Sequence, residues 1–258
     1  MKKRTLLPLT LAAAFALAGC AGGGETAPSS SPAAAETTPA AQTTSAAQTT
    51  SAAPTAEAAK PAGGQLSAQQ LAEIADTLAD GNSQAQIVDK QTIVAQLPMA
   101  EQQIKAMKIE PAECAQFVAA DVNAEFEKME MITVALPGEG ALDSTSVSIV
   151  SYKDPADAKA NISKAQSSLK DCSEFSIEMQ GQKVTTKTTD VKAKTDGSVT
   201  QANRSDIQIP GGSMTTLSVS AQQENNLVSV SKTGMKATDA DIAEAEKLTN
   251  KVLDLLNK

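Results

Sequence analysis

The feature that most constrains the fold of this chain is a change of composition at residue 64. From Ala21 to Gly64 the chain consists almost entirely of Ala, Thr, Ser, Pro, Gly and Gln, without aromatic or branched aliphatic side chains. Such a stretch buries too little apolar surface to offset its conformational entropy, so we expect it to be disordered. The folded domain must therefore come from residues 65–258, a length typical of one domain.

The first residues have the pattern of an export signal. Met1–Arg4 carries three positive charges, and Thr5–Leu17 is an apolar run too short to span a bilayer comfortably as a permanent helix. The next residues, Leu17-Ala18-Gly19-Cys20, resemble the lipobox of bacterial lipoproteins. This resemblance implies that residues 1–19 are a signal peptide and that the Cys20 thiol carries lipid, which anchors a protein to a membrane without spanning it.

Residues 20–64 would then tether the domain to the membrane. A flexible coil of this length has a root-mean-square reach of roughly 35 to 40 Å. Thr and Ser clusters in it are compatible with a solvated spacer or with O-linked sugar. The domain of residues 65–258 carries 18 basic and 27 acidic residues, a net charge of -9, and should be repelled by an anionic membrane.

Capping patterns predict the helices of the domain. Ser67 and Gln70 form a capping-box pattern at the start of a helix that should end near Asp80. Pro98 and Pro111 each lie where a further helix could begin. The clearest later starts are Asp154, for a helix ending at Asp171–Cys172, and Thr238, for the last helix.

Alternating segments predict the strands. Segments 128–136 and 144–152 have period-two hydrophobicity with Pro137 and two glycines between them, which indicates an antiparallel pair. Five further strands are expected at 175–179, 184–194, 199–209, 214–222 and 227–232. Helices, a run of strands and a closing helix together predict an α+β fold.

Composition excludes several classes of function. The chain has no His and no Trp, so histidine-based nucleophile activation and His-ligated metal sites are absent. The net charge of -8 lacks the basic face that phosphate binding requires, so we expect no nucleic-acid partner. No cofactor, metal site or catalytic residue is indicated, and we expect a protein that is not an enzyme.

The cysteine count predicts one disulfide. If Cys20 carries lipid, Cys114 and Cys172 remain as an even pair in an oxidising compartment. A bridge between them would contribute about 4 kcal/mol in the chain-entropy model. A redox or metal-binding pair is the alternative, which the wide spacing, the lack of a CxxC motif and the lack of histidine disfavour.

Several of these features together resemble a known family. Pro111-Ala-Glu-Cys114, Asp154-Pro155-Ala-Asp157-Ala and Leu169-Lys-Asp-Cys172, in this layout of elements, look like actinobacterial surface lipoproteins related to the extracellular sensor domains of PknH-type kinases. The resemblance implies an antiparallel sheet flanked by helices, a disulfide between Cys114 and Cys172, and a sensing or binding role. Those sensor domains can carry a second disulfide, for which this chain has no cysteines, and this chain has no kinase domain.

The function expected from the sequence is that of a membrane-anchored extracytoplasmic lipoprotein. It would act as a non-enzymatic binding or sensing module for a small-molecule, lipid or protein ligand that the sequence does not identify. The alternative is a carrier of a lipid or other hydrophobic ligand, held in a cavity between the sheet and the helices.

Overall fold

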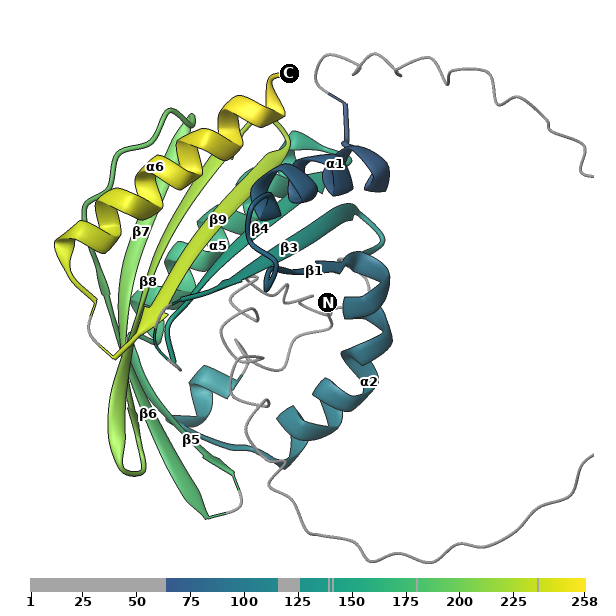
Figure 1. Ribbon diagram of the computed structural model, residues 1–258. Helices are drawn as coiled ribbons and strands as arrows, with labels where there is room; N and C mark the ends of the chain where they lie inside the picture. The colour runs from purple at the N-terminus through teal and green to yellow at the C-terminus, as the bar shows by residue number, and fades with distance from the viewer. Residues whose placement is uncertain (1–63, 116–125, 139, 141, 180, 236) are drawn as a thin grey trace, which may run out of the picture.

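The nine strands of the computed structural model join in one antiparallel sheet of order β1-β3-β4-β9-β8-β7-β6-β5-β2 (Figure 1). The structure describes residues 64–115, 126–138, 140, 142–179, 181–235 and 237–258. The strands are β1 (Gln86–Asp89), β2 (Lys108–Glu110), β3 (Met129–Pro137), β4 (Ser144–Tyr152), β5 (Glu174–Met179), β6 (Gln182–Asp190), β7 (Val199–Ile209), β8 (Gly212–Gln223) and β9 (Asn226–Gly234). The helices are α1 (Ala68–Ala79), α2 (Lys90–Ala106), the short 3-10 helix η3 (Ala112–Cys114), α5 (Pro155–Asp171) and α6 (Asp239–Leu256). The expected α+β fold, an antiparallel sheet flanked by helices, is confirmed.

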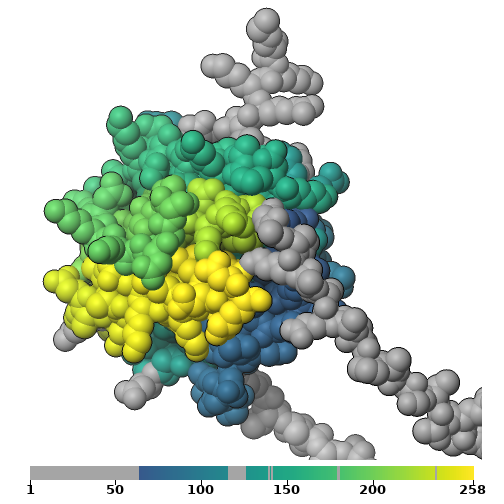
Figure 2. All heavy atoms as spheres, turned by 90° about the horizontal axis from the view of Figure 1, so that it is seen from above, coloured from purple at the N-terminus to yellow at the C-terminus, as the bar shows by residue number. Residues whose placement is uncertain are grey.

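Helices α1 and α6 cover one face of the sheet and lie side by side there (Figure 2). Both begin with the capping boxes expected from the sequence, Ser67 with Gln70 and Thr238 with Asp241. Their apolar stripes pack on alternate residues of β3, β4, β8 and β9 to form the main core. This core includes Leu71, Ala75, Val134, Val147, Val219, Val230, Val252 and Leu253, each exposed by 2% or less.

Helix α5 lies on the opposite face (Figure 1). Its start follows the expected pattern, because the Asp154 carboxylate accepts a 2.8 Å hydrogen bond from the Ala156 amide and Pro155 occupies the first turn. Ala158 and Ile162 are buried against Tyr152 at the end of β4. Only this first part of α5 belongs to that apolar cluster. The last residue of α5 precedes Cys172, which lies near the β5 and β2 edge of the sheet.

Pro98 does not begin a helix, contrary to the sequence prediction. It lies inside α2, which begins earlier because the Asp89 carboxylate accepts a hydrogen bond from the Thr92 amide at 2.8 Å. A proline at this position removes one backbone hydrogen bond. Burial of Leu97 and Ala100 on either side of it accompanies the continued helix. The two short edge strands, β1 and β2, were not predicted at all.

Two other predicted elements differ in extent. The strand expected at 184–194 ends at Asp190, because the chain leaves the sheet there and the Lys194 amide donates to the Glu246 carboxylate of α6 at 2.7 Å. The helix expected from Pro111 begins as η3, and residues 116–125 lie outside the described residues.

Both ends of the described domain meet at one end of the sheet. The Leu66 amide donates to the Ser151 hydroxyl at 2.8 Å, and the Gln223 side chain donates to Asn257 at 2.7 Å. The β3–β4 and β7–β8 connections therefore lie at the opposite end. Among the described helices, none has the length and apolar character needed to cross a membrane.

Candidate functional site

The strands send their charged side chains almost entirely to one face of the sheet. Strand side chains alternate between the two faces of the sheet. The pairing register therefore assigns each charged side chain either to the face of the core residues of β3 and β9 or to the opposite face. Among the described strands, Asp190 at the end of β6 is the one charged residue on the α5 face. All others project to the face of α1 and α6: Asp89, Lys108, Glu110, Glu130, Glu174, Glu178, Lys183, Lys187, Arg204, Asp206 and Lys232.

Uncharged polar side chains occupy the centre of the α5 face instead. They form three rows that run across the strands, because residues paired between neighbouring strands have the same chemistry. We call this surface the hydroxyl face. Its rows are Thr133, Ser148, Ser229, Ser220 and Gln201; then Ser146, Ser231, Ser218 and Asn203; then Ser144, Thr233, Thr216, Ser205 and Thr188.

Neighbouring hydroxyls on this face bond to one another across the strands. The oxygens of Ser220 and Ser229 are 2.8 Å apart, and those of Ser218 and Ser231 are 2.9 Å apart. In each pair one hydroxyl donates, so the other keeps its hydrogen available, and both keep acceptor capacity. All four serines are intermediate in exposure. The face can therefore offer both donors and acceptors to a ligand.

Apolar groups border the hydroxyl face on two sides. Val150, Tyr152 and Leu227 lie at the end where α5 begins. On the side of β5 and β2, the border is a smaller cluster that contains Phe175 and Ile177. The hydroxyl face thus lies between two packed regions.

A disulfide joins the far end of α5 to η3. The sulfur atoms of Cys114 and Cys172 are 2.07 Å apart and their Cα atoms 5.7 Å apart. This agrees with the pairing implied by the resemblance and favoured by the cysteine count. The link fixes α5 at the β5 side of the hydroxyl face, while Ala158 and Ile162 fix it at the β4 side. Cys20, the predicted lipid-attachment residue, lies outside the described residues.

Titratable groups do not form a reactive centre in the described part of the chain. No group of three Asp, Glu or Cys residues there is placed to hold a metal ion. The buried ammonium of Lys164 on α5 already has a partner. The hydroxyl and amide groups of the hydroxyl face offer hydrogen bonds to a ligand.

The perturbed carboxyl and ammonium groups lie mainly on the other face. Burial lowers the pKa of Lys232, but hydrogen bonds to Glu244 and Asp241 outweigh it, so the net effect is a raised pKa. The same contact with Lys232, supported by the Thr238 amide, holds the pKa of Asp241 below its usual range. These contacts join β9 to the first turn of α6 and are structural.

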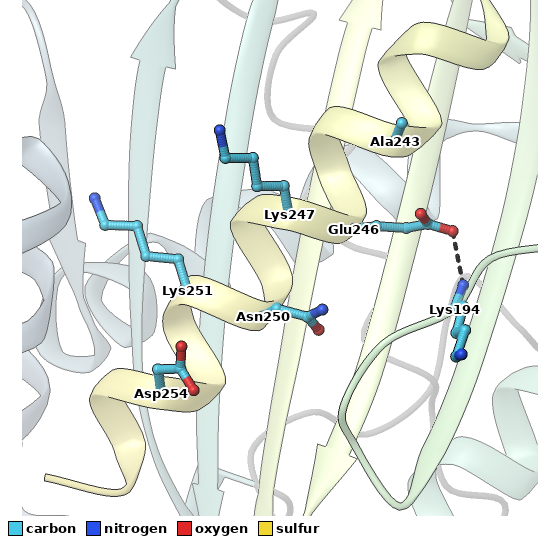
Figure 3. Close-up of a pocket in the computed structure, with 7 residues that line it drawn as sticks. All are labelled: Lys194, Ala243, Glu246, Lys247, Asn250, Lys251 and Asp254. Atoms are coloured by element: carbon cyan, nitrogen blue, oxygen red, sulfur yellow. Dashed lines mark hydrogen bonds between the residues drawn. The ribbon is translucent and has the colours of Figure 1, made fainter.

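A hollow on the outer surface of α6 is a weaker candidate. It has a volume of about 520 Å³ and is shallow and open. Figure 3 shows that Lys247 and Lys251 point to one side of α6 while Glu246 points to the other, toward Lys194. Glu246 and Asn250 already accept hydrogen bonds from the backbone amides of Lys194 and Asp196. These residues hold the 191–198 segment on the helix and do not converge on a ligand.

Sequence analysis did not identify the hydroxyl face. Its signal was present, since alternate positions of 216–220 and 229–233 are Ser or Thr. By itself this alternation predicts strands and not a shared surface. Which strands pair, and hence whether these hydroxyls meet, depends on a strand order that the local sequence does not encode.

Two solved structures resemble the described domain, and the first of them has a similar fold. A similar solved structure is the extracellular domain of PknH from Mycobacterium tuberculosis, at 14% identity and a TM-score of 0.50, covering 75% of this chain and 97% of that chain. An uncharacterized protein from Mycobacterium smegmatis has 17% identity and a TM-score of 0.40, covering 73% of this chain and 97% of its own. No curated protein matches the chain.

The sequence profile of the PknH-like extracellular domain family matches residues 70–254, most of the chain. This match also gives an extracytoplasmic location for the domain. The family expected from the cysteine placement and element layout is confirmed. The chain therefore belongs to the family of PknH-like extracellular domains.

Proposed function

We propose that the protein is a membrane-anchored binding or sensing module whose domain holds an uncharged polar ligand against the hydroxyl face. In this proposal residues 1–19 are removed as a signal peptide and Cys20 carries the lipid. Residues 20–64 tether the domain of residues 65–258 to the extracytoplasmic side of the cell membrane. The proposal includes no catalytic step, no cofactor and no nucleic acid.

The observation that carries the ligand site is the separation of charge between the two faces of the sheet. A face that only packs against helices is apolar, as under α1 and α6. A solvated face normally carries charge, as the other face of β5 and β6 does at Glu174, Lys183 and Lys187. The rows of the hydroxyl face are half-buried and polar but uncharged, with the one strand charge of this side, Asp190, at their edge beside Asn203, and this suits a neutral ligand rich in hydroxyl or amide groups.

The carrier of a hydrophobic ligand remains the alternative, but the hydroxyl face does not favour it. A hydrocarbon chain lying there would remove water from Ser218, Ser220, Ser229 and Ser231 without replacing their hydrogen bonds. An apolar-lined cavity would be needed instead. Lipid that co-purifies with the protein in stoichiometric amount would reverse this preference.

Two tetrasaccharides with the same sugar backbone, one neutral and one carrying amines, test the ligand site. The neutral probe is a tetramer of N-acetylglucosamine, and the charged probe is the same tetramer without its acetyl groups. We expect amide chemical-shift changes in β7, β8 and β9 with the neutral probe, little changed by salt because no charge pair forms. Binding should be weak, since few aromatic rings are present to stack a sugar. Equal binding of the cationic tetramer, or absence of any shift on these strands, would contradict the proposal.

A matched pair of variants places the same charge on each face of β8. Ser220→Asp puts a carboxylate into the hydroxyl face and should abolish the shifts, whereas Ser213→Asp, on the opposite face, should leave them unchanged. If Ser220→Asp does not fold, the double variant Ser220→Ala with Ser229→Ala removes one hydroxyl pair without adding charge. Binding that survives both changes to the hydroxyl face would exclude it as the site.

The membrane anchor is tested separately. Wild-type protein expressed in a bacterial host that processes lipoproteins should partition into the detergent phase. Cys20→Ser removes the thiol that would carry the lipid and should leave the protein in the aqueous phase. A Cys20→Ser protein that still partitions with detergent would refute the lipid anchor and leave the ligand proposal unaffected.

A further inference from the structure

A second hollow lies on the face of α1 and α6, at the end of the sheet opposite Gln65 and Asn257. Its volume is about 410 Å³. The floor consists of alternate residues of β7 and β8, and Met235 and Ala237, which follow β9, line one side. The residues that line it include Arg204, Asp206, Gln208, Thr215 and Met235. None of them belongs to the hydroxyl face.

An oriented guanidinium lies in the floor of this hollow. Arg204 Nε donates to the two carboxylate oxygens of Asp206 at 3.0 and 3.3 Å, and Arg204 Nη2 is 3.0 Å from Asp206 Oδ1. The Thr215 hydroxyl donates to the same Oδ1 at 2.9 Å. Asp206 is thereby held with its oxygens turned toward Arg204 and Thr215. It fixes the direction of the guanidinium and balances its charge.

Part of the Arg204 fork is still available. Beyond Asp206, the one acceptor found for it in the described part of the chain is the Ala237 carbonyl, 3.5 Å from Nη1. A guanidinium has five N–H donors, so the end-on edge formed by Nη1 and Nη2 keeps donors without an acceptor. The Arg204 side chain as a whole is 40% exposed. Its fork geometry matches the two oxygens of a carboxylate.

An exposed apolar side chain lines the same hollow. Met235 is 57% exposed, although large apolar residues are mostly buried in this domain. Gln208, also in the lining, is exposed and adds an amide donor and acceptor. Together these groups provide a bidentate anion donor, a neutral polar group and an apolar contact within one hollow.

We propose that this hollow binds the carboxylate of a small ligand, either a peptide C-terminus or a free organic acid, through the end-on edge of Arg204. Asp206 is the positioning residue that holds the guanidinium in place. Met235 contacts the part of the ligand next to the carboxylate. This site is independent of the hydroxyl face and takes a different class of ligand.

Three probes distinguish the possible ligands in a nitrogen-15 shift titration of the folded domain. They are N-acetyl-Ala-Ala with a free carboxylate, the same dipeptide as its C-terminal amide, and acetate. We expect shifts around 204–208 and 213–215 with the free acid and at least tenfold weaker binding of the amide. Acetate that binds as well as the dipeptide would assign a free organic acid, and weaker acetate binding would assign a peptide terminus. Equal binding of acid and amide overturns the proposal.

Variants separate binding from a purely structural ion pair. Arg204→Gln should weaken binding of the dipeptide acid at least tenfold, and Arg204→Lys should restore only part of it because an ammonium lacks the fork. Gln208→Glu leaves the Arg204–Asp206 contacts intact but adds a negative charge, and it should weaken binding while the melting temperature stays unchanged. If Gln208→Glu and Arg204→Gln both bind like wild type, Arg204 serves only to hold the connection at Ala237, and the proposal is wrong.

Discussion

The two halves of the sheet are stabilised in different ways. We call β1, β3, β4, β9 and β8 the inner half and the remaining four strands the outer half. One face of the inner half packs against α1 and α6, and the first part of α5 covers part of its other face. In the outer half, β7, β6, β5 and β2 bear mainly polar side chains on the face of α1 and α6, whereas their other face mixes polar residues with apolar ones such as Phe175 and Ile177. There the apolar packing is a small cluster around Ile109 and the Cys114–Cys172 disulfide.

This difference indicates where a polar binding surface can lie without disrupting the main core. Burial of apolar area is the main source of folding free energy, and the inner half contains most of it. The outer half is held by backbone pairing to β8, by cross-strand charge pairs and by one covalent link. The Arg204 hollow lies where β8 of the inner half meets β7 of the outer half, and the hydroxyl face extends across the same boundary from β3 to β6.

Removing the disulfide should have the largest effect and should fall mainly on the outer half. The link closes a loop with a sequence separation of 58, worth about 4 kcal/mol in the chain-entropy model. We expect Cys114→Ala with Cys172→Ala to accelerate hydrogen exchange at β5 and β6 more than at α6. Reduced wild-type protein is the matched control. Equal acceleration in all three elements would mean that the two halves unfold as one unit.

Removing a buried leucine from the inner half should have the next largest effect. Leu253 of α6 is 2% exposed within the main core, so Leu253→Ala should lower the free energy of unfolding by about 3 kcal/mol. Leu255 on the same helix is only partly buried, and Leu255→Ala should cost about 1 kcal/mol. Urea unfolding measures both. Similar losses for the two variants would contradict the placement of the core.

The sequence predicted most elements of both halves and missed one edge strand in each, β1 and β2. Capping boxes and hydrophobic periodicity specify α1, α6, β3 and β4, because in these elements local preference and tertiary burial agree. The overlong strand ending at Lys194 arose where a tertiary contact, that of the Lys194 amide with Glu246, overrides the local pattern. The misplaced helix start at Pro98 has a different cause, because the true start is marked by a local signal, the capping hydrogen bond from the Thr92 amide to Asp89.

The candidate sites were less predictable than the fold. Cys114 and Cys172 could be proposed as a pair because only two cysteines remain once Cys20 is assigned. The hydroxyl rows join strands that are far apart in sequence, such as β4 and β9, so their chemistry appears only with the strand order. Arg204 and Asp206 are two residues apart in a predicted strand, so their side chains lie on the same face and their ion pair is a local signal.

Removing a polar contact should lower the free energy of unfolding by different amounts in the two halves. Asn225 is fully buried beside β4, where its side-chain amide donates to the Tyr152 carbonyl at 2.5 Å. Asn225→Ala leaves that buried carbonyl without its donor and should cost about 2 kcal/mol. Thr188→Val removes the 2.9 Å contact with Ser205 at the outer half and should cost less than about 1 kcal/mol, since Ser205 is partly exposed and can bond to water. Urea unfolding of the two variants that reversed this order would contradict the distinction between the halves.

Acid should produce the smallest difference between the halves. Hydrogen bonds from Arg204 and Thr215 hold the pKa of Asp206 below its usual range, and the contact with Lys232 does the same for Asp241. A carboxyl whose pKa is lower in the folded state stabilises the protein above its unfolded pKa of about 3.9, and this stabilisation is lost as pH falls through the folded pKa. Each contribution should be less than about 1 kcal/mol because the side chains are 42% and 27% exposed. Asp241→Asn should therefore reduce the difference in unfolding free energy between pH 7 and pH 3 more than Asp206→Asn does. A larger effect of Asp206→Asn would mean that the contacts of Asp206 in the outer half stabilise its carboxylate more than the contact between β9 and α6 stabilises that of Asp241. The expected electrostatic difference between the two halves would then be wrong.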